Sequence, residues 1–195
     1  MGYVKREIRR LTKEAGSKAL ARRRAEEWYE ESTRSRKLTE ASMVRTRFEP
    51  GKIYVFEYDP ITENLPWFDR NPVVLAIERV DDNDLGINLN LLPVKFKEQL
   101  MDDLYDRLEG QINSASSGSK YNNAKSQRPL RITYDGVKAY LKRFGYDFAI
   151  RQYKPNRKSR QAVVSYQSWP QIALCDFITL NGATVRGIRL LFSRR

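Results

Sequence analysis

The sequence predicts an α+β fold, in which a small β-barrel or strongly twisted antiparallel sheet is decorated by helices. Three observations lead to this prediction. Residues 3–31 contain no proline and consist mostly of Ala, Arg, Lys, Glu and Leu, which favours a long helix. Short runs of β-branched and aromatic residues, separated by turn residues, fill residues 51–93 and are typical of strands. Apolar residues then repeat with helical spacing in residues 94–110 and 133–145.

The N-terminal helix is expected to be long and basic, with one weak apolar stripe. A helix that is polar on most sides rarely stabilises itself, so we expect it to lie against a partner or to project from the domain. Arg22, Arg23 and Arg24 precede four glutamates by one turn in "ARRRAEEWYEE". They are either ion-paired residues of a solvated helix or, together with Trp28, protein contacts of a binding arm. The following "STRSRKLTEAS" is typical of a linker.

Three strands are predicted in the central part. The first, "GKIYVFEY", alternates, so Ile53 and Val55 should share one face while Tyr54 and Phe56 share the other. The second, "NPVVLAIERV", is nearly continuous in apolar residues and should be buried on both faces. "DDNDLG" is interpreted as a turn, and "INLNLLP" as a third short strand that ends at Pro93. Short strands joined by loops commonly build a small curved barrel, and an SH3-like barrel is the architecture that we expect.

The rest of the chain mixes helices and strands. "VKFKEQLMDDLYDRLEG" predicts an amphipathic helix that stops at Gly110, and "TYDGVKAYLKRFG" predicts another that ends at Gly145. "YDFAIRQYKPNRKSRQAVVSYQSW" predicts two strands around a basic loop. The pattern favours packing of Tyr153 and Tyr166 on this hairpin over their stacking on unpaired bases. A strand, "QIALCDF", and a last basic helix, "ATVRGIRLLFSRR", are expected to complete the fold.

Charge divides the chain into three parts, although the net charge over all 195 residues is +12. Residues 1–47 carry 14 Lys or Arg against 7 Asp or Glu, residues 48–110 carry 6 against 14, and residues 111–195 carry 16 against 3. Segregated charge of this size indicates oriented contacts with a polyanion or a large assembly. The expected organisation is a basic helical arm and linker (1–47) and an α+β domain (48–195) made of an acidic barrel and helix part (48–110), a flexible loop (111–128) and a basic part (129–195).

The residue content excludes several kinds of chemistry. The chain has no histidine and one cysteine, so a Cys/His zinc site, a Ser-His-Asp triad and an internal disulfide are ruled out. Cys175 is expected to be a buried, inert thiol. The sequence has no glycine-rich phosphate loop, and its clustered acidic residues sit where Asp and Asn usually form turns. We therefore expect no catalytic group, metal, cofactor or small-molecule substrate. No apolar run approaches the ~20 residues of a membrane span and the N-terminus lacks a signal-peptide core, which predicts a soluble protein.

The basic residues of the C-terminal part are candidates for contacts with duplex DNA. Lysine and arginine neutralise phosphates, and no motif that reads bases is present, so binding would be non-specific. Alternatively, these cations are solvated or contact acidic protein surfaces, including the central part of another copy. The candidates are Lys154, Arg157, Lys158 and Arg160 on the predicted basic loop, and Arg186, Arg189 and Arg194 on the last predicted helix.

Several motifs resemble the DNA end protector family of T-even-type tailed phages. They are "GKIYVFEYDPITENLPWFDRNPVVLAIERVDDNDLGINLNLLP", "FAIRQYKPNR" and "IALCDFITLNGATVRGIRLLFSRR". The chain departs from the family pattern at Leu91, where an aromatic residue is expected, and at Cys175 and Asp176, where Leu-Pro is expected. The opening "PGKIYVFEYDP" with "RNPVVLAI" is also similar to toxin ribonucleases built on a small barrel.

The phage resemblance implies a non-enzymatic virion protein at the head or neck that binds the packaged DNA end and shields it from nucleases. It also implies other virion proteins as partners and several copies per particle, assembled in the host cytoplasm. Trp67 and Phe68 join the arginines of the N-terminal helix as candidate protein contacts. The alternative is a connector, tail or baseplate subunit that makes only protein contacts. A third possible function is that of a nuclease on the toxin-like barrel.

Overall fold

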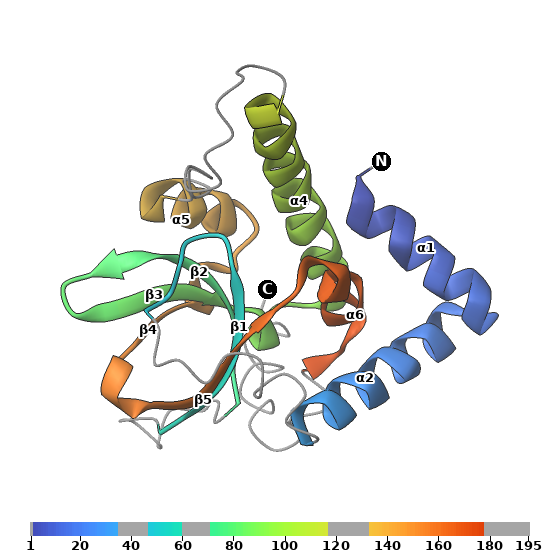
Figure 1. The fold of residues 1–195 in the computed structure, drawn as a ribbon, viewed down its shortest axis with the longest axis horizontal. Coiled ribbons are helices and arrows are strands. Elements are labelled where there is room, and N and C mark those ends of the chain that lie inside the picture. Colours follow the sequence, from blue (N-terminus) through green and yellow to red (C-terminus); the bar gives the residue numbers. More distant parts are fainter. Residues whose placement is uncertain (1, 35–46, 60–70, 117–132, 178–195) are drawn as a thin grey trace.

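The computed structural model describes residues 2–34, 47–59, 71–116 and 133–177 (Figure 1), and for residues 33–34, 107–116 and 160 the backbone alone. The elements, in chain order, are α1 (Tyr3–Ala15), α2 (Lys18–Arg34), β1 (Ile53–Tyr58), β2 (Val73–Val80), β3 (Asn83–Asn88), η1 (Leu89–Leu91), α4 (Val94–Ser116), α5 (Tyr134–Arg143), η2 (Asp147–Ala149), β4 (Ile150–Tyr153), η3 (Pro155–Arg157), β5 (Lys158–Val164), η4 (Tyr166–Ser168) and α6 (Trp169–Leu174), where η marks a 3-10 turn.

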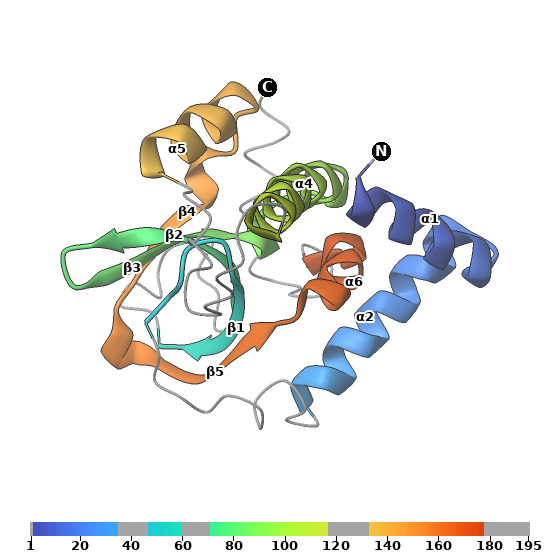
Figure 2. The ribbon, with the colours of Figure 1, turned by 45° about the horizontal axis from the view of Figure 1, so that its top comes forward.

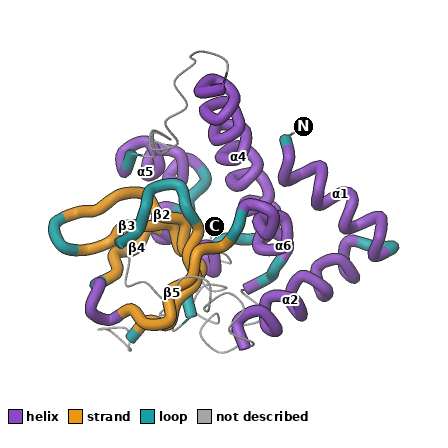
Figure 3. The backbone as a smooth tube through the Cα atoms, in the orientation of Figure 1, coloured by secondary structure: helices purple, strands orange, loops and turns teal. Residues whose placement is uncertain are grey.

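The strands form one antiparallel sheet in the order β4-β3-β2-β1-β5, which curls strongly into half a barrel (Figure 2). The α+β class and the curved antiparallel sheet are thus confirmed. The two faces predicted for β1 are also found. Ile53 and Val55 belong to the main core, which the helices share, whereas Tyr54 and Phe56 belong to a second, largely aromatic cluster. Figure 3 shows the strands gathered on one side, with α1, α2, α4 and α6 on the other.

The β2–β3 hairpin has a shorter turn than the sequence predicts. Val80 pairs with Asn83, so only Asp81 and Asp82 form the loop, and Asp81 has a φ of 54°. Two-residue hairpin turns need this left-handed conformation, which Asp tolerates better than most residues. Because the turn is so short, β3 starts inside the segment predicted to be a turn and ends before the predicted Pro93. The burial predicted for β2 is confirmed, since Val73 to Ile77 are all buried.

The predicted hairpin of β4 and β5 is wrong. β4 pairs with β3 and β5 pairs with β1, so these two consecutive strands occupy opposite edges of the sheet. The chain crosses from one edge to the other through the 3-10 turn η3. Local alternation identifies a strand but not its partner, and the curl of the sheet brings the two edges near enough for a short connection.

The single long N-terminal helix is replaced by two helices. Gly16 ends α1 with a φ of 83°, a left-handed conformation that favours glycine, and its N–H donates to the Lys13 carbonyl at 3.2 Å. The Ser17 hydroxyl then accepts a hydrogen bond from the Leu20 N–H at 3.2 Å and caps α2. α1 packs on α4 and α2 packs on α6, so both helices lie against other helices of the fold instead of projecting from it (Figures 1 and 2). The predicted domain boundary after residue 47 stays a prediction.

Two further expectations fail for local reasons. α4 runs through Gly110 to Ser116, because one glycine inside an otherwise favourable helix costs only about 1 kcal/mol. The predicted strand "QIALCDF" lies largely in α6, where Pro170 occupies the first turn and the apolar residues are buried in the core. A short apolar run fits a buried helix as well as a strand. α5 has its predicted position, and the last predicted helix lies outside the described residues.

Candidate nucleic-acid interface

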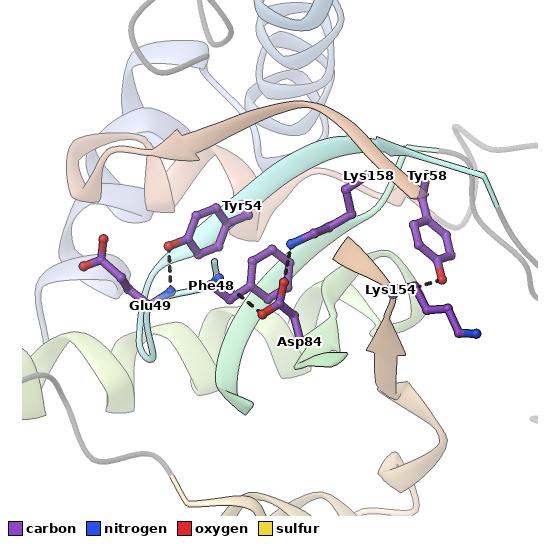
Figure 4. A network of polar contacts seen from close by, with 7 residues as sticks. All are labelled: Phe48, Glu49, Tyr54, Tyr58, Asp84, Lys154 and Lys158. Carbon is purple, nitrogen blue, oxygen red and sulfur yellow. Dashed lines mark hydrogen bonds and ion pairs between the residues drawn. The ribbon is translucent and has the colours of Figure 1, made fainter. Parts of the chain in front are cut away.

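The predicted basic loop forms a corner of the sheet, where the chain leaves β4 and enters β5. Pro155 opens η3, because its fixed φ suits the first position of a helical turn and no amide donor is needed there. Lys154 and Asn156 are exposed, and the side chain of Arg157 is 36% exposed. Figure 4 shows two of the contacts near this corner, those of Lys154 with Tyr58 and of Lys158 with Asp84. Two of the four predicted loop cations, Lys154 and Arg157, therefore reach solvent here.

Lys158 points inward instead. Its ammonium forms an ion pair with Asp84 of β3, and these side chains are only 5% and 1% exposed. The ammonium lies 3.9 Å from the ring centroid of Phe48, whose backbone N–H donates to Asp84 at 3.4 Å (Figure 4). Burial lowers the pKa of Lys158, while the hydrogen bond to Asp84 and the charge of Asp84 oppose that shift. The structure thus places Lys158 inside the curled sheet, where it ties β5 to β3.

The end of β1 fixes the exposed part of the corner. Arg157 Nη1 lies 2.6 Å from Asp59 Oδ2, and the Asp59 N–H donates to the Arg157 carbonyl at 3.0 Å. The Tyr58 hydroxyl accepts a hydrogen bond from the Lys154 N–H at 3.4 Å (Figure 4). Within the described residues, the Lys154 ammonium forms no ion pair. As far as the described residues show, the positive charge of Lys154 is unpaired, whereas the charge of Arg157 is shared with Asp59.

The tyrosines beside the corner pack against other rings. Tyr153 is 4% exposed, and its ring centroid lies 5.2 Å from those of Phe56 and Tyr58 with edge-to-face geometry. Tyr166 is 37% exposed and lies 5.0 Å from Trp169. The predicted packing of Tyr153 on a hairpin is wrong, because β4 and β5 are not paired; its ring packs in the aromatic cluster of the sheet.

Some of the candidate protein-contact residues on α2 pack against the rest of the protein, and others are exposed to solvent. Arg22 Nη1 lies 3.8 Å from Asp176 Oδ2, just after α6. Arg23 pairs with Glu27 at 3.0 Å on the exposed face, as the Arg-before-Glu spacing predicted, and Arg24 is exposed. Trp28 is half-buried against the main core. Arg23 and Arg24 are therefore the members of this set that α2 presents to solvent.

Several predicted site residues are not described by the structure. Arg160 lies in β5, but its side chain is among those not described. Trp67, Phe68, Arg186, Arg189 and Arg194 lie outside the described residues. Their proposed roles stay predictions.

Sequence reasoning missed two groups of charged residues. Asp84 was assigned to turn formation, and its partner Lys158 is 74 positions away, so no local pattern could have joined them. Lys5, Arg9 and Lys13 repeat every four residues along α1, which places them on one face of the helix. This spacing is visible in the sequence and could have indicated a basic stripe.

A second buried lysine lies in the main core. Lys97 of α4 is fully buried, donates to the Cys175 carbonyl at the end of α6, and has its ammonium 4.3 Å from the Phe177 ring centroid. Burial lowers the pKa of Lys97 to about 8, against the raising effect of Cys175 and Asp176. Cys175 is buried as predicted, and burial raises the pKa of its thiol to about 12, which makes it unreactive.

The described ranges contain no group of three or more Cys, Asp or Glu side chains placed to hold a metal ion. None of the helices described has the length and apolar content needed to cross a membrane.

Comparison with known proteins places the chain in a family. Residues 2–182 match the family described as phage T4 terminal DNA protecting protein. No curated protein and no solved structure was found to match. The match spans every described element, including the two N-terminal helices that lie outside the motifs of the sequence resemblance. The chain therefore belongs to the phage terminal DNA protecting protein family.

Proposed function

We propose that this protein binds the end of packaged phage DNA at the head or neck of the virion and shields it from nucleases without catalysis. The observation that carries this proposal is the family match over residues 2–182. The net charge of +12 supports it, because an excess of Lys and Arg favours association with the phosphate backbone. Other virion proteins as neighbours and several copies per particle belong to the same proposal.

The corner of the sheet is the part of the proposed interface that the structure describes. Lys154 and Arg157 contact phosphates, together with Arg160 and, beyond the described residues, Arg186, Arg189 and Arg194. Lys158 supports these contacts from inside, since its ion pair with Asp84 fixes the start of β5. The strand order, with a 3-10 turn between the last two strands, supports an SH3-like half-barrel as the scaffold.

The test is binding to linear and circular duplex DNA over a salt series, followed by exonuclease digestion. We expect salt-dependent binding to both forms, protection of the linear ends, and intact DNA when the exonuclease is left out. A protein that binds but leaves the ends open to digestion would contradict shielding.

A charge-removal variant tests the corner. Lys154→Gln with Arg160→Gln should weaken binding and reduce the salt slope by about 2, or about 1 for each phosphate that is no longer neutralised. The matched control, Lys142→Gln with Arg143→Gln on the exposed end of α5, removes the same charge and should bind nearly as the wild type does.

A connector, tail or baseplate subunit with only protein contacts is the second candidate function. It is favoured by the ion pairs of Arg157 and Lys158, which reduce the charge available to DNA. In that case Arg22, Arg23, Arg24, Trp28, Trp67 and Phe68 would contact neighbouring subunits. Absence of DNA binding at low salt would support this second function.

A further inference from the structure

A groove of about 520 Å³ lies at the elbow between α1 and α2, on the side of α4. Its lining is strongly basic, with four cations and one carboxylate among eight residues. The lining residues are Lys5, Ile8, Arg9, Thr12, Lys13, Gly16, Lys18 and Glu98. Such a concentration of positive charge in one concave site attracts anions more strongly than the same charges on a flat surface.

Two of the four cations are held in place by carboxylates of α4. Lys5 Nζ lies 3.3 Å from Asp102 Oδ2, and Lys18 Nζ lies 2.7 Å from Glu98 Oε1. Both lysine side chains remain nearly half exposed, so the ion pairs position them without burying them. Lys5 and Lys18 therefore line the groove in positions set by their ion pairs, and the two carboxylates neutralise much of their charge.

The other two cations supply the net charge. Arg9 and Lys13 are exposed, and neither forms an ion pair with any residue in the described ranges. From Lys5 through Arg9 to Lys13, α1 rises by about 12 Å, a length over which duplex DNA carries about seven phosphate charges.

The elbow adds hydrogen-bond donors to these charges. Thr12 contributes a hydroxyl group, and the amino end of the 17-residue helix α2 lies beside Gly16. The amino end of a helix favours anions, because its first N–H groups are unpaired and the peptide dipoles add up there. A Cβ atom built on Gly16 would meet no atom within 4 Å, so the space beside Gly16 is open.

We propose that the elbow groove binds phosphate groups of DNA, through Arg9 and Lys13 as the charged contacts and Thr12 as a hydrogen-bond donor. This inference rests on the proposed function, and it adds the elbow between α1 and α2 to the DNA-binding surface. The phosphates come either from the terminus of the duplex or from its backbone, since both present the same charged oxygens.

The experiment measures the affinity of the full chain for three DNAs of equal length: a linear duplex with 5′-phosphates, the same duplex with 5′-hydroxyls, and a closed circle. The variant is Arg9→Gln with Lys13→Gln, two exposed positions where the fold should be retained. The control is Lys142→Gln with Arg143→Gln on α5, which lies on the other side of α4 (Figures 1 and 2). Polyglutamate serves as an anionic polymer without phosphate.

We expect the groove variant to bind DNA on the order of tenfold more weakly than the control and to have a salt slope smaller by about 2. A loss confined to the 5′-phosphorylated duplex assigns the groove to the terminal phosphate, and an equal loss on all three DNAs assigns it to the backbone.

If the groove variant binds DNA with the same affinity and the same salt slope as the wild type, the groove inference is wrong. The proposed function would still hold in that case. A loss seen for polyglutamate alone would likewise overturn the groove inference in favour of an acidic protein partner. If the wild type binds none of the three DNAs, the proposed function fails, and the groove inference fails with it.

Discussion

The ammonium of Lys158 and the carboxylate of Asp84 face each other almost out of contact with water, at 5% and 1% exposure. Removing one partner of such a pair leaves the other charge buried and uncompensated, which typically costs roughly 3–5 kcal/mol. We expect Asp84→Asn and Lys158→Met each to lower the free energy of unfolding by about 3 kcal/mol. The double variant should lose much less than the sum of the two. Urea unfolding of all four proteins measures this coupling, and strictly additive losses would contradict it.

The buried Lys97 makes the free energy of unfolding depend on pH in the alkaline range. Its pKa is about 8 in the folded protein, against about 10.4 in an unfolded chain, so between these values the unfolded state binds more protons. Unfolding therefore becomes harder as pH rises through this window, by up to about 1.4 kcal/mol per unit. Cys175 acts in the opposite sense above about pH 9, because its folded pKa is raised to about 12.

The Lys97→Met variant isolates this contribution. The difference in unfolding free energy between wild type and variant should shift in favour of the wild type by about 3 kcal/mol between pH 7.5 and pH 10.5. Urea unfolding at a series of pH values measures the difference, with Cys175→Ser in both proteins, because Cys175 and Lys97 shift each other's pKa. A difference that stays constant with pH would show that Lys97 keeps an ordinary pKa.

At the scale of elements, the hairpin of β2 and β3 depends on close approach at Gly86. A Cβ atom there would lie 2.2 Å from Val74 Cγ1 and 2.8 Å from the Leu75 carbonyl oxygen, so the strands would have to separate. We expect Gly86→Ala to lower the free energy of unfolding by about 3 kcal/mol. Gly16→Asn is the control, because its site is open and Asn tolerates the left-handed conformation, so its loss should stay within about 1 kcal/mol. Equal losses in a urea titration would contradict the close-packing argument.

The sequence predicted those elements whose signal is local. The two faces of β1, the apolar run of β2 and the position of α5 all correspond to the structure. The predictions that were wrong concern features that depend on contacts with residues far away in the sequence. The apolar residues of α6 fit helix or strand equally, and packing against α2 and α4 selects the helix. The partners of β4 and β5 depend on the curl of the whole sheet.

At the scale of the molecule, the acidic part of the chain neutralises cations from both basic flanks. Asp102 and Glu98 pair with Lys5 and Lys18 of the N-terminal helices, while Asp59 and Asp84 pair with Arg157 and Lys158 of the C-terminal part. The sequence revealed the three-part charge pattern but not these pairs, because each joins residues far apart in the chain. The sequence could therefore predict only that the candidate site is positively charged. Ion pairs formed in the folded protein decide which Lys and Arg side chains remain available to bind DNA.

Because Asp59 neutralises Arg157, a variant that lacks the Asp59 charge should bind DNA more tightly if the corner contacts DNA. Asp59→Asn removes a carboxylate that lies 2.6 Å from Arg157, at a cost of at most about 1 kcal/mol because Asp59 is 71% exposed. The freed guanidinium should tighten DNA binding a few-fold and increase the salt slope by up to about 1. The control is Glu27→Gln on α2, which releases Arg23 from an exposed ion pair away from the corner and changes the net charge equally. If the corner contacts DNA, only Asp59→Asn increases the affinity. Equal gains in both variants would show that net charge alone is responsible and would remove the corner from the interface.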